Sequence, residues 1–250
     1  MSRRALRGAV LPMLLLAAWE GASRTGLADP RLLPSPEAVA AAAWHGATGG
    51  GLPGHLAISI CRDLAGFALG AAAGLPFGFL LGLSRVARTL LGPGFDAVRQ
   101  IAVFAWIPLI AMWFGIGETA KIVFIAIAAF APVALNTAEG VRSASRDLLE
   151  VGAVFRFTRA QRIRRIFLPG ALPSILTGVH LGLINAWLAT IGAEYFMTAG
   201  SGIGGLVIEG RDRFDMAQVM LGVLLLATTG FAFNAIAAAG EKRLLRWRRV

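Results

Sequence analysis

Few side chains in this sequence have the types and spacing that catalysis or metal binding requires. His45, His55 and His180 are scattered without a carboxylate cluster, and the single Cys61 excludes an internal disulfide or a cysteine-based metal cluster. The segment 200–205 fits G-x-G-x-x-G, but it follows an apolar run, whereas a dinucleotide site needs a preceding strand. No phosphate-binding G-x-x-x-x-G-K-[ST] motif occurs. The sequence therefore predicts no enzymatic activity, no cofactor bound by this chain, and a flexible external loop at 200–205.

A carboxylate inside an apolar run is the remaining candidate for chemistry, because such groups mark ion and proton pathways in membranes. Of the 14 acidic residues, only Glu194 falls clearly within such a run, near its outer end. Asp63 stands at the edge of another run beside Arg62. An ion-driven carrier normally needs a buried relay of charges near the midplane, and the sequence shows none. Glu194 either lines a translocation path or pairs with a neighbouring helix.

Basic residues gather in one long loop between two apolar runs, within 140–169. Four residues of this loop at helical spacing predict a small apolar face: Val151, Val154, Phe155 and Thr158. Such a face on a charged loop indicates a docking site, in which Phe155 enters a hydrophobic groove of a partner. Glu150 is expected to cap or brace the start of this helix, where the dipole favours a carboxylate. The alternative is a solvated basic loop without a partner.

The elements that must position these residues are membrane helices. Hydrophobic residues make up 56% of the 250-residue chain and charged residues 15%, at a mean hydropathy of +0.69. Soluble domains are richer in charge, and a membrane span needs roughly 20 mostly apolar residues. The sequence therefore predicts an all-α integral membrane protein, with one domain over 1–250 and a core over 56–240. About six spans are expected, near 5–22, 64–83, 101–115, 122–135, 175–196 and 217–239.

The distribution of positive charge predicts the orientation of these spans, because lysine and arginine are retained on the cytoplasmic side. With the N-terminus inside, 18 of the 24 lysines and arginines fall on the cytoplasmic side, in the same loops and termini. Both termini and the 140–169 loop are therefore expected inside, with 23–60 and 197–214 outside. The net charge of +10 then follows from topology, and nucleic acid is not an expected partner.

The N-terminal region allows two interpretations. A basic start and a short apolar core fit a cleaved signal peptide, whereas Trp19 beside Glu20 fits a retained span that ends at the outer interface. Retention is the favoured interpretation. Ser35 before Pro36 then predicts the start of an external helix over about 36–44, lying along the membrane surface.

Glycines recur every four residues in the second predicted span, where they let helix backbones approach closely. The candidates for helix packing are Gly66, Gly70, Gly74, Gly78 and Gly82, together with Gly178 and Gly182 in the fifth span. They indicate either packing within one subunit or a seam between two. Pro76, Pro108 and Pro132 are expected to kink the second to fourth spans, and Pro169 and Pro173 to break the chain before the fifth.

The basic loop resembles the EAA loop of ABC-importer permeases, whose outline is E-A-A-x3-G-x9-I-x-L-P. Glu150 and the segment Ile166–Pro169 match this outline, whereas Gly152 replaces its second alanine and Arg156 its glycine. An arginine at that glycine would be strained if the turn needs a positive φ. Further matches follow in order along the chain, at 33–39, 108–109, 113–118, 136–137, 140–142, 168–173, 193–194 and 202–204.

This ordered set resembles a permease subunit of the nitrate, sulfonate and taurine type. The resemblance implies a type I ABC-importer fold with a cytoplasmic coupling helix, working as a homodimer in the bacterial inner membrane. It also implies separate ATPase subunits and an external solute-binding protein as partners, and nitrate, a sulfonate, taurine or a related small solute as cargo. The coupling residues it implies are Glu150, Val151, Gly152, Val154, Phe155, Arg156, Thr158, Arg159, Ile166, Leu168 and Pro169. The alternative function is a secondary carrier or channel that needs no ATPase.

Overall fold

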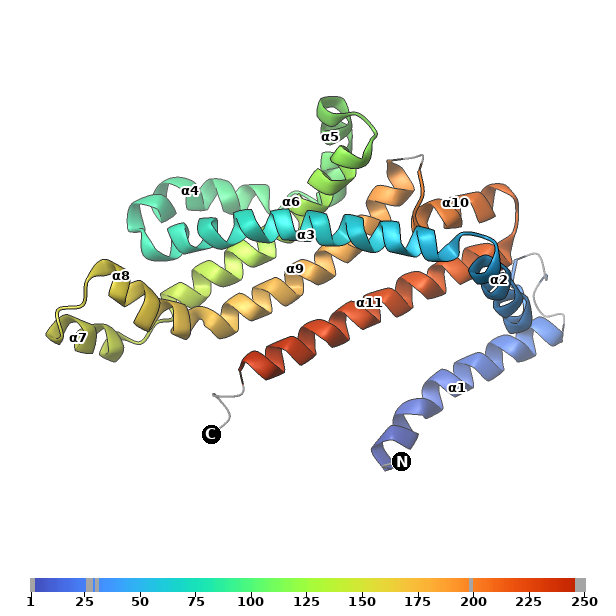
Figure 1. Ribbon diagram of the computed structural model, residues 1–250, viewed down its shortest axis with the longest axis horizontal. Coiled ribbons are helices and arrows are strands. Elements are labelled where there is room, and N and C mark those ends of the chain that lie inside the picture. Colours follow the sequence, from blue (N-terminus) through green and yellow to red (C-terminus); the bar gives the residue numbers. More distant parts are fainter. Residues whose placement is uncertain (1–2, 26–28, 30–31, 198–199, 246–250) are drawn as a thin grey trace. The chain divides into compact units, whose positions relative to one another are not determined.

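The computed structural model describes residues 3–25, 29, 32–197 and 200–245, and every regular element in this part of the chain is a helix (Figure 1). The helices before the basic loop are α1 (Arg3–Arg24), α2 (Pro36–Thr48), α3 (Leu52–Leu83), α4 (Arg85–Val98), the 3-10 helix η1 (Val103–Trp106), α5 (Ile107–Phe114) and α6 (Glu118–Arg142). The later ones are α7 (Arg146–Val154), α8 (Arg159–Arg162), the π-helix η2 (Ile163–Phe167), α9 (Leu168–Phe196), α10 (Ile203–Asp212) and α11 (Met216–Leu244). The prediction of an all-α protein is confirmed.

Four helical segments in the described part of the chain are long and apolar enough to cross a membrane: α3, α6, the run Arg159–Phe196, and α11. They contain the predicted second, fourth, fifth and sixth spans. The third predicted span, over 101–115 with a kink at Pro108, covers only the second half of the apolar segment. That region belongs to a helix pair, Arg85–Val98 and Val103–Phe114, bent by 92°, which makes a fifth span if the pair crosses together. The first predicted span coincides with α1, whose side chains over 3–9 lie outside the described part.

Residue contacts divide the chain into two compact units. Unit 1 comprises Met1–Ser59 and Ala199–Thr228, and unit 2 comprises Ile60–Thr198 and Thr229–Val250. A single domain over 1–250 with a core at 56–240 stays a prediction.

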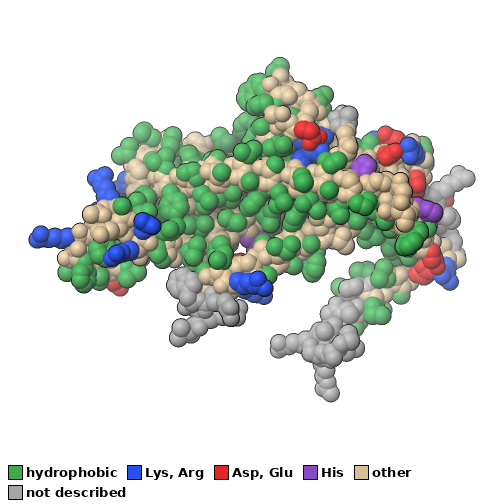
Figure 2. All heavy atoms as spheres, in the orientation of Figure 1, with side chains coloured by type: hydrophobic (Ala, Val, Ile, Leu, Met, Phe, Trp, Pro, Cys, Tyr) green, Lys and Arg blue, Asp and Glu red, His purple; other side chains and the backbone are tan. Residues whose placement is uncertain are grey.

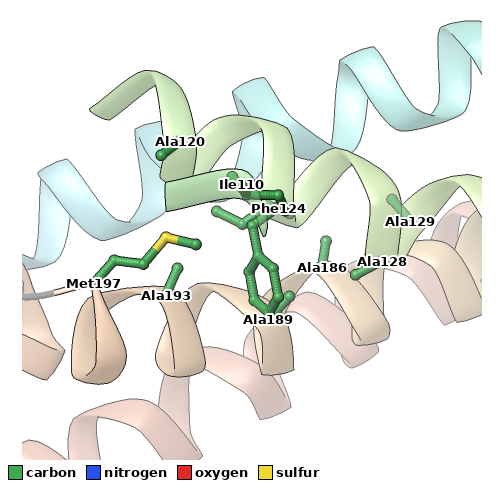
Figure 3. Packing of buried hydrophobic residues seen from close by; sticks show 10 residues of the cluster. Ile110, Ala120, Phe124, Ala128, Ala129, Ala186, Ala189, Ala193 and Met197 are labelled. Atoms are coloured by element: carbon green, nitrogen blue, oxygen red, sulfur yellow. The ribbon is translucent and has the colours of Figure 1, made fainter. Parts of the chain in front are cut away.

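The core of unit 2 is built around α6, which packs closely against α9. Figure 3 shows Phe124 of α6 extending toward the small residues Ala186 and Ala189 of α9, with Ile110 of α5 beside it. Phe124 is fully buried, and Ala186 and Ala189 are nearly so. Because alanine leaves room for an aromatic ring, the two helix backbones approach each other without a gap.

The glycine stripe of α3 lies against the same helix α6. A Cβ placed on Gly78 would stand 2.6 Å from the Thr137 Cβ, and one on Gly74 would stand 2.9 Å from the Phe130 carbonyl oxygen. Gly66, Gly70 and Gly82 also meet α6, and from α9 so do Gly178 and Gly182. The glycines of α3 therefore pack within one subunit, which is one of the two roles expected for them; the other was a seam between two subunits.

Proline shapes unit 2 differently from what its positions in the sequence suggested. Pro76 and Pro132 lie inside α3 and α6, as expected, but Pro108 is in the first turn of α5, where a missing N–H is harmless. Pro169 and Pro173 do not break the chain, because helix continues from Arg159 to Phe196. The π-turn η2 directly precedes Pro169, and its wider backbone relieves the clash that a proline ring makes with the preceding turn.

Unit 1 joins α2 and the start of α3 to α1, α10 and the start of α11. Trp19 donates a hydrogen bond from Nε1 to the Pro34 carbonyl at 2.9 Å and packs on the cluster of Val39, Leu52, Leu206 and Leu221. Retention of the first helix stays a prediction. The helix predicted from Ser35 and Pro36 is confirmed as α2, where Ser35 Oγ accepts a hydrogen bond from the Ala38 N–H at 3.2 Å, and its external position stays a prediction.

The prediction of a flexible loop at 200–205 is wrong from Gly202 onward. The Gly202 N–H donates to His55 Nδ1 at 3.1 Å, and the Ile203 N–H donates to Ser59 Oγ at 2.9 Å. These bonds attach the start of α10 to α3 within unit 1. His55 and Ser59, which accept these bonds, lie more than 140 residues before the start of α10 in the sequence. Local sequence patterns do not reveal such distant partners for the N–H groups of a helix start.

Candidate functional site

The basic loop contains the short helix α7, which leaves an apolar patch uncovered. Four of its hydrophobic side chains are exposed: Leu148 by 53%, Val151 by 49%, Val154 by 80% and Phe155, just past its end, by 70%. Such a patch among charged residues marks an interaction site more often than an ordinary surface. Figure 2 shows Lys and Arg side chains gathered around it, over α7 and α8. Val151, Val154 and Phe155 of the predicted apolar face are therefore exposed together, whereas Thr158 lies beyond the turn at the start of α8 and is not part of this face. Within the chain, the Phe155 ring contacts the Phe157 ring, with ring centroids 6.2 Å apart.

A tight turn ends α7 directly after Phe155. The Phe157 N–H donates to the Gly152 carbonyl at 2.8 Å, and the Arg156 N–H donates to the Ala153 carbonyl at 2.9 Å. This pair of bonds is the Schellman arrangement, which requires a left-handed residue between them. Arg156 occupies that position with φ = 53°. The turn therefore does need a positive φ, and arginine adopts it where the family outline has glycine.

Gly152 and Ile166 hold α7 against the chain that follows. A Cβ on Gly152 would lie 2.8 Å from Ile166 Cδ1, so no larger residue fits without displacing that side chain. Ile166 is buried, and Arg165 stacks on the other side of the turn, 5.5 Å from the centre of the Phe157 ring. Gly152, which departs from the family outline, and Ile166, which matches it, thus lie against each other.

Thr158 begins the next helix with a reciprocal cap. Its Oγ1 accepts from the Gln161 N–H at 3.3 Å, and its own N–H donates to Gln161 Oε1 at 2.8 Å. Arg159 follows on the exposed first turn of α8, and Leu168 and Pro169 lie in the first turn of α9. Thr158 therefore fixes local structure, while Arg159 remains available to a partner.

The predicted role of Glu150 at the start of the helix is wrong. Helix α7 begins at Arg146 after Ser145, which places Glu150 in its middle, and the acidic residue of the first turn is Asp147. The Glu150 side chain is exposed. The start was misplaced because the apolar spacing that was counted began at Val151, one turn inside the real helix.

A second candidate site is a buried group of charges in unit 2. Arg62 of α3 donates from Nε and Nη2 to the two carboxylate oxygens of Glu118, both at 2.7 Å, and from Nη1 to Glu194 Oε1. Lys121 Nζ donates to Glu118 Oε1 at 3.3 Å. The Arg62, Lys121 and Glu194 side chains are almost fully buried. Three helices are therefore joined by one ionic cluster, and Glu194 makes the helix-pairing contact that was one of its two expected roles.

Asp63 lies next to this cluster but bonds differently. Its Oδ1 accepts from Thr190 Oγ1 of α9 at 3.0 Å, and its Oδ2 has no hydrogen-bond partner among the described residues. The sequence-based prediction did not include Arg62 as the partner of Glu194, nor Glu118 and Lys121 as members of the same cluster. The predicted topology contained the signal, because it places all four residues at the outer ends of their spans.

The sequence is similar to those of known transport permeases. Residues 74–249 match the model of a family described as the binding-protein-dependent transport system inner membrane component. SsuC of Bacillus subtilis strain 168, named as an aliphatic sulfonates transport permease protein, is 36% identical over 97% of this chain and 88% of its own. TauC of Escherichia coli K12, a taurine transport system permease protein, is 33% identical over 94% and 86%. CmpB of Synechococcus elongatus, a bicarbonate transport system permease protein, is 33% identical over 75% and 68%.

Solved structures show the same fold at low sequence identity. The MetNI methionine ABC transporter in an inward-facing conformation has a chain that aligns with a TM-score of 0.57 at 23% identity, covering 72% of this chain and 92% of that one. A chain of an amino acid ABC transporter aligns with a TM-score of 0.61 at 16% identity over 76% and 92%. The chain therefore belongs to the family of binding-protein-dependent transport system inner membrane components, the permease subunits of ABC importers.

Proposed function

We propose that this permease imports a small sulfonate and that helix α7 couples it to the ATPase subunits. Support for the cargo comes from the relatives, since the names of SsuC and TauC specify aliphatic sulfonates and taurine, which is itself a sulfonate. CmpB is named for bicarbonate, another small anion. The proposed cargo is therefore an aliphatic sulfonate, delivered by an external solute-binding protein.

The observation that carries the coupling proposal is the uncovered patch on α7. Phe155 and Val154 are more exposed than most large hydrophobic side chains of the unit 2 helices, although they lie in the most basic loop of the chain. A partner with an apolar groove and an acidic rim would bury this patch and offset the charge. An ATPase subunit that closes on ATP would then displace α7, and the continuous helix from Arg159 to Phe196 would transmit that movement to the spans.

The assembly and orientation are part of the same proposal. Two identical chains would pair in the bacterial inner membrane, with both termini and the 140–169 loop in the cytoplasm. The bias of arginine and lysine toward one set of loops supports this orientation. The ATPase subunits then meet α7 from the cytoplasm, and the binding protein meets the segments 23–60 and 197–214 from outside.

Transport in reconstituted vesicles tests this function. We expect uptake of a radiolabelled alkanesulfonate to require the ATPase subunits, ATP and the external binding protein together, and unlabelled taurine to compete. Uptake of nitrate or bicarbonate alone would contradict the sulfonate cargo while leaving the importer intact.

The secondary carrier that the sequence left as an alternative is the less favoured function, because the buried cluster around Arg62 and Glu118 lies at the outer ends of the predicted spans, whereas ion coupling uses charges near the midplane. The same vesicles distinguish the two. Uptake driven by a proton or sodium gradient without ATPase subunits would establish the carrier and exclude the importer.

A further inference from the structure

A hollow of about 530 Å³ in unit 2 lies where α3 gives way to α4 and where α8 begins. Three arginines from two separate elements line it: Arg85 of α4, and Arg159 and Arg162 of α8. None of the three forms an ion pair with a described residue of the chain. Three positive charges around one hollow repel one another, and a bound anion offsets that repulsion.

The backbone adds positive potential to the same place. Ser84 lines the hollow and caps the 14-residue helix α4, its Oγ accepting from the Ala87 N–H at 3.1 Å. The first turn of a helix carries partial positive charge and directs N–H groups outward, which favours phosphate and other anions. The arginines and the helix start therefore select the same kind of ligand.

The remaining lining is apolar, contributed by Leu83, Val86, Ile163 and Phe167. Leu83 is 40% exposed and Val86 is 69% exposed, so this apolar part of the lining is not covered by other parts of unit 2. A free inorganic anion would leave it uncovered. A ligand with a charged head and an apolar body would contact both halves of the lining.

In the proposed topology, the hollow lies on the cytoplasmic side, at the ends of two helices that are long and apolar enough to cross the membrane. Leu83 is the last residue of one candidate span, and Arg159 is the first residue of another. Phospholipid headgroups occupy this level, and the cytoplasmic leaflet carries negative charge that attracts basic segments next to spans.

We propose that this hollow binds the phosphate headgroup of an anionic phospholipid of the cytoplasmic leaflet. The guanidinium groups of Arg85, Arg159 and Arg162 would hold the phosphate, and the apolar part of the lining would contact the glycerol backbone and the first acyl carbons. The inference rests on the proposed function only for the side of the membrane. The proposed ATPase surface is the α7 patch. Four lining residues of the hollow, Leu83 to Val86, lie outside the coupling loop, and the other four lie within 140–169, so the test has to separate a lipid from the ATPase.

Lipid titration of the purified full-length permease tests this site. Native mass spectrometry would count the lipid molecules bound per permease. Dioleoyl phosphatidylglycerol would be compared with dioleoyl phosphatidylcholine, which has the same acyl chains but no net charge. The double variant Arg85→Gln/Arg162→Gln removes one charge from each side of the hollow. The matched control, Arg88→Gln/Arg164→Gln, removes one charge from each of the same two regions without touching the lining.

We expect phosphatidylglycerol to bind in preference to phosphatidylcholine and its affinity to fall roughly 30-fold in the Arg85/Arg162 variant. The control should bind as the unmodified chain does, and millimolar inorganic phosphate should not displace the lipid. Equal losses in both variants, no preference for phosphatidylglycerol, or displacement by phosphate alone would each overturn the lipid site. A separate co-purification measures how the Arg85/Arg162 variant retains the ATPase subunits. Unchanged lipid binding together with lost ATPase co-purification would overturn the lipid site and assign the hollow to the ATPase. Because the permease alone is titrated, failure of α7 coupling would leave this result intact.

Discussion

Arg156 is the residue at which this chain departs most from the family outline, and its backbone is left-handed with φ = 53°. A non-glycine residue in this conformation costs about 1–2 kcal/mol. We therefore expect Arg156→Gly to raise the free energy of unfolding of the permease by about 1 kcal/mol in a thermal or denaturant melt. As a control, Arg88→Gly removes the same side chain from a helical position in α4 and should lower stability by about 1 kcal/mol. A loss of stability in the Arg156 variant would contradict the strained turn.

Arg62 forms ion pairs with both Glu118 and Glu194. Removing one partner of a buried ionic group commonly costs about 3–5 kcal/mol, so Arg62→Leu should abolish the assembled permease in a detergent-solubilised membrane extract. Glu194→Gln keeps a hydrogen-bond acceptor and leaves Glu118 beside Arg62, so the protein should still assemble.

Transport by the Glu194→Gln variant then decides between the two roles of this residue. Normal assembly with reduced sulfonate uptake is the expected result if Glu194 also lines the translocation path. Normal assembly with normal uptake would restrict Glu194 to helix pairing, and loss of assembly would show that its charge is indispensable to the fold.

At the scale of elements, the glycine stripe determines how closely α3 and α6 approach. A Cβ at Gly78 would lie 2.6 Å from the Thr137 Cβ, whereas Gly54, in the same helix, has no atom within 4 Å of its Cβ position. Gly78→Ala should therefore destabilise the permease by about 1–3 kcal/mol, while Gly54→Ala should be neutral or stabilising by up to about 1 kcal/mol. Melting temperatures in detergent measure both. Equal effects of the two substitutions would show that packing against α6 is not what the stripe provides.

Patterns within one helix predicted most of the elements, and contacts between helices account for most of the errors. The apolar runs identified α3, α6, α9 and α11, and the Ser35-Pro36 pair identified α2. The bend between α4 and α5 and the π-turn before Pro169 were missed, since both depend on how the backbone accommodates a break and not on hydrophobicity.

Of the two candidate sites, one follows from spacing within a single helix and the other depends on contacts between helices. The exposed face of α7 follows from residues three and four apart, so spacing alone revealed Val151, Val154 and Phe155. The Arg62–Glu118–Glu194 cluster joins residues 56 and 132 positions apart, and only the order and direction of the spans indicated that they meet.

At the scale of the whole molecule, the orientation in the membrane follows from the charge bias, and cysteine labelling tests it. In a chain with Cys61 replaced by alanine, single cysteines are introduced at Ser145, before α7, and at Ser201, before α10. Both positions are exposed. A membrane-impermeant maleimide added to intact spheroplasts should modify Ser201→Cys and spare Ser145→Cys until the membrane is opened. Modification of both from the same side would contradict the proposed topology.

Helix α7 is proposed to couple this permease to its ATPase through Phe155. Truncating an aromatic anchor in an interface commonly costs on the order of 2 kcal/mol or more, a weakening of roughly 30-fold. The direct measurement is substrate-stimulated ATP hydrolysis by the reconstituted importer with Phe155→Ala, compared with Phe231→Ala in α11, an aromatic side chain of similar exposure (74% against 70%). We predict that Phe155→Ala abolishes the stimulation and reduces ATPase co-purification, while Phe231→Ala retains both. Full stimulation with Phe155→Ala would contradict the account, because the exposed patch on α7 would then not be the coupling element.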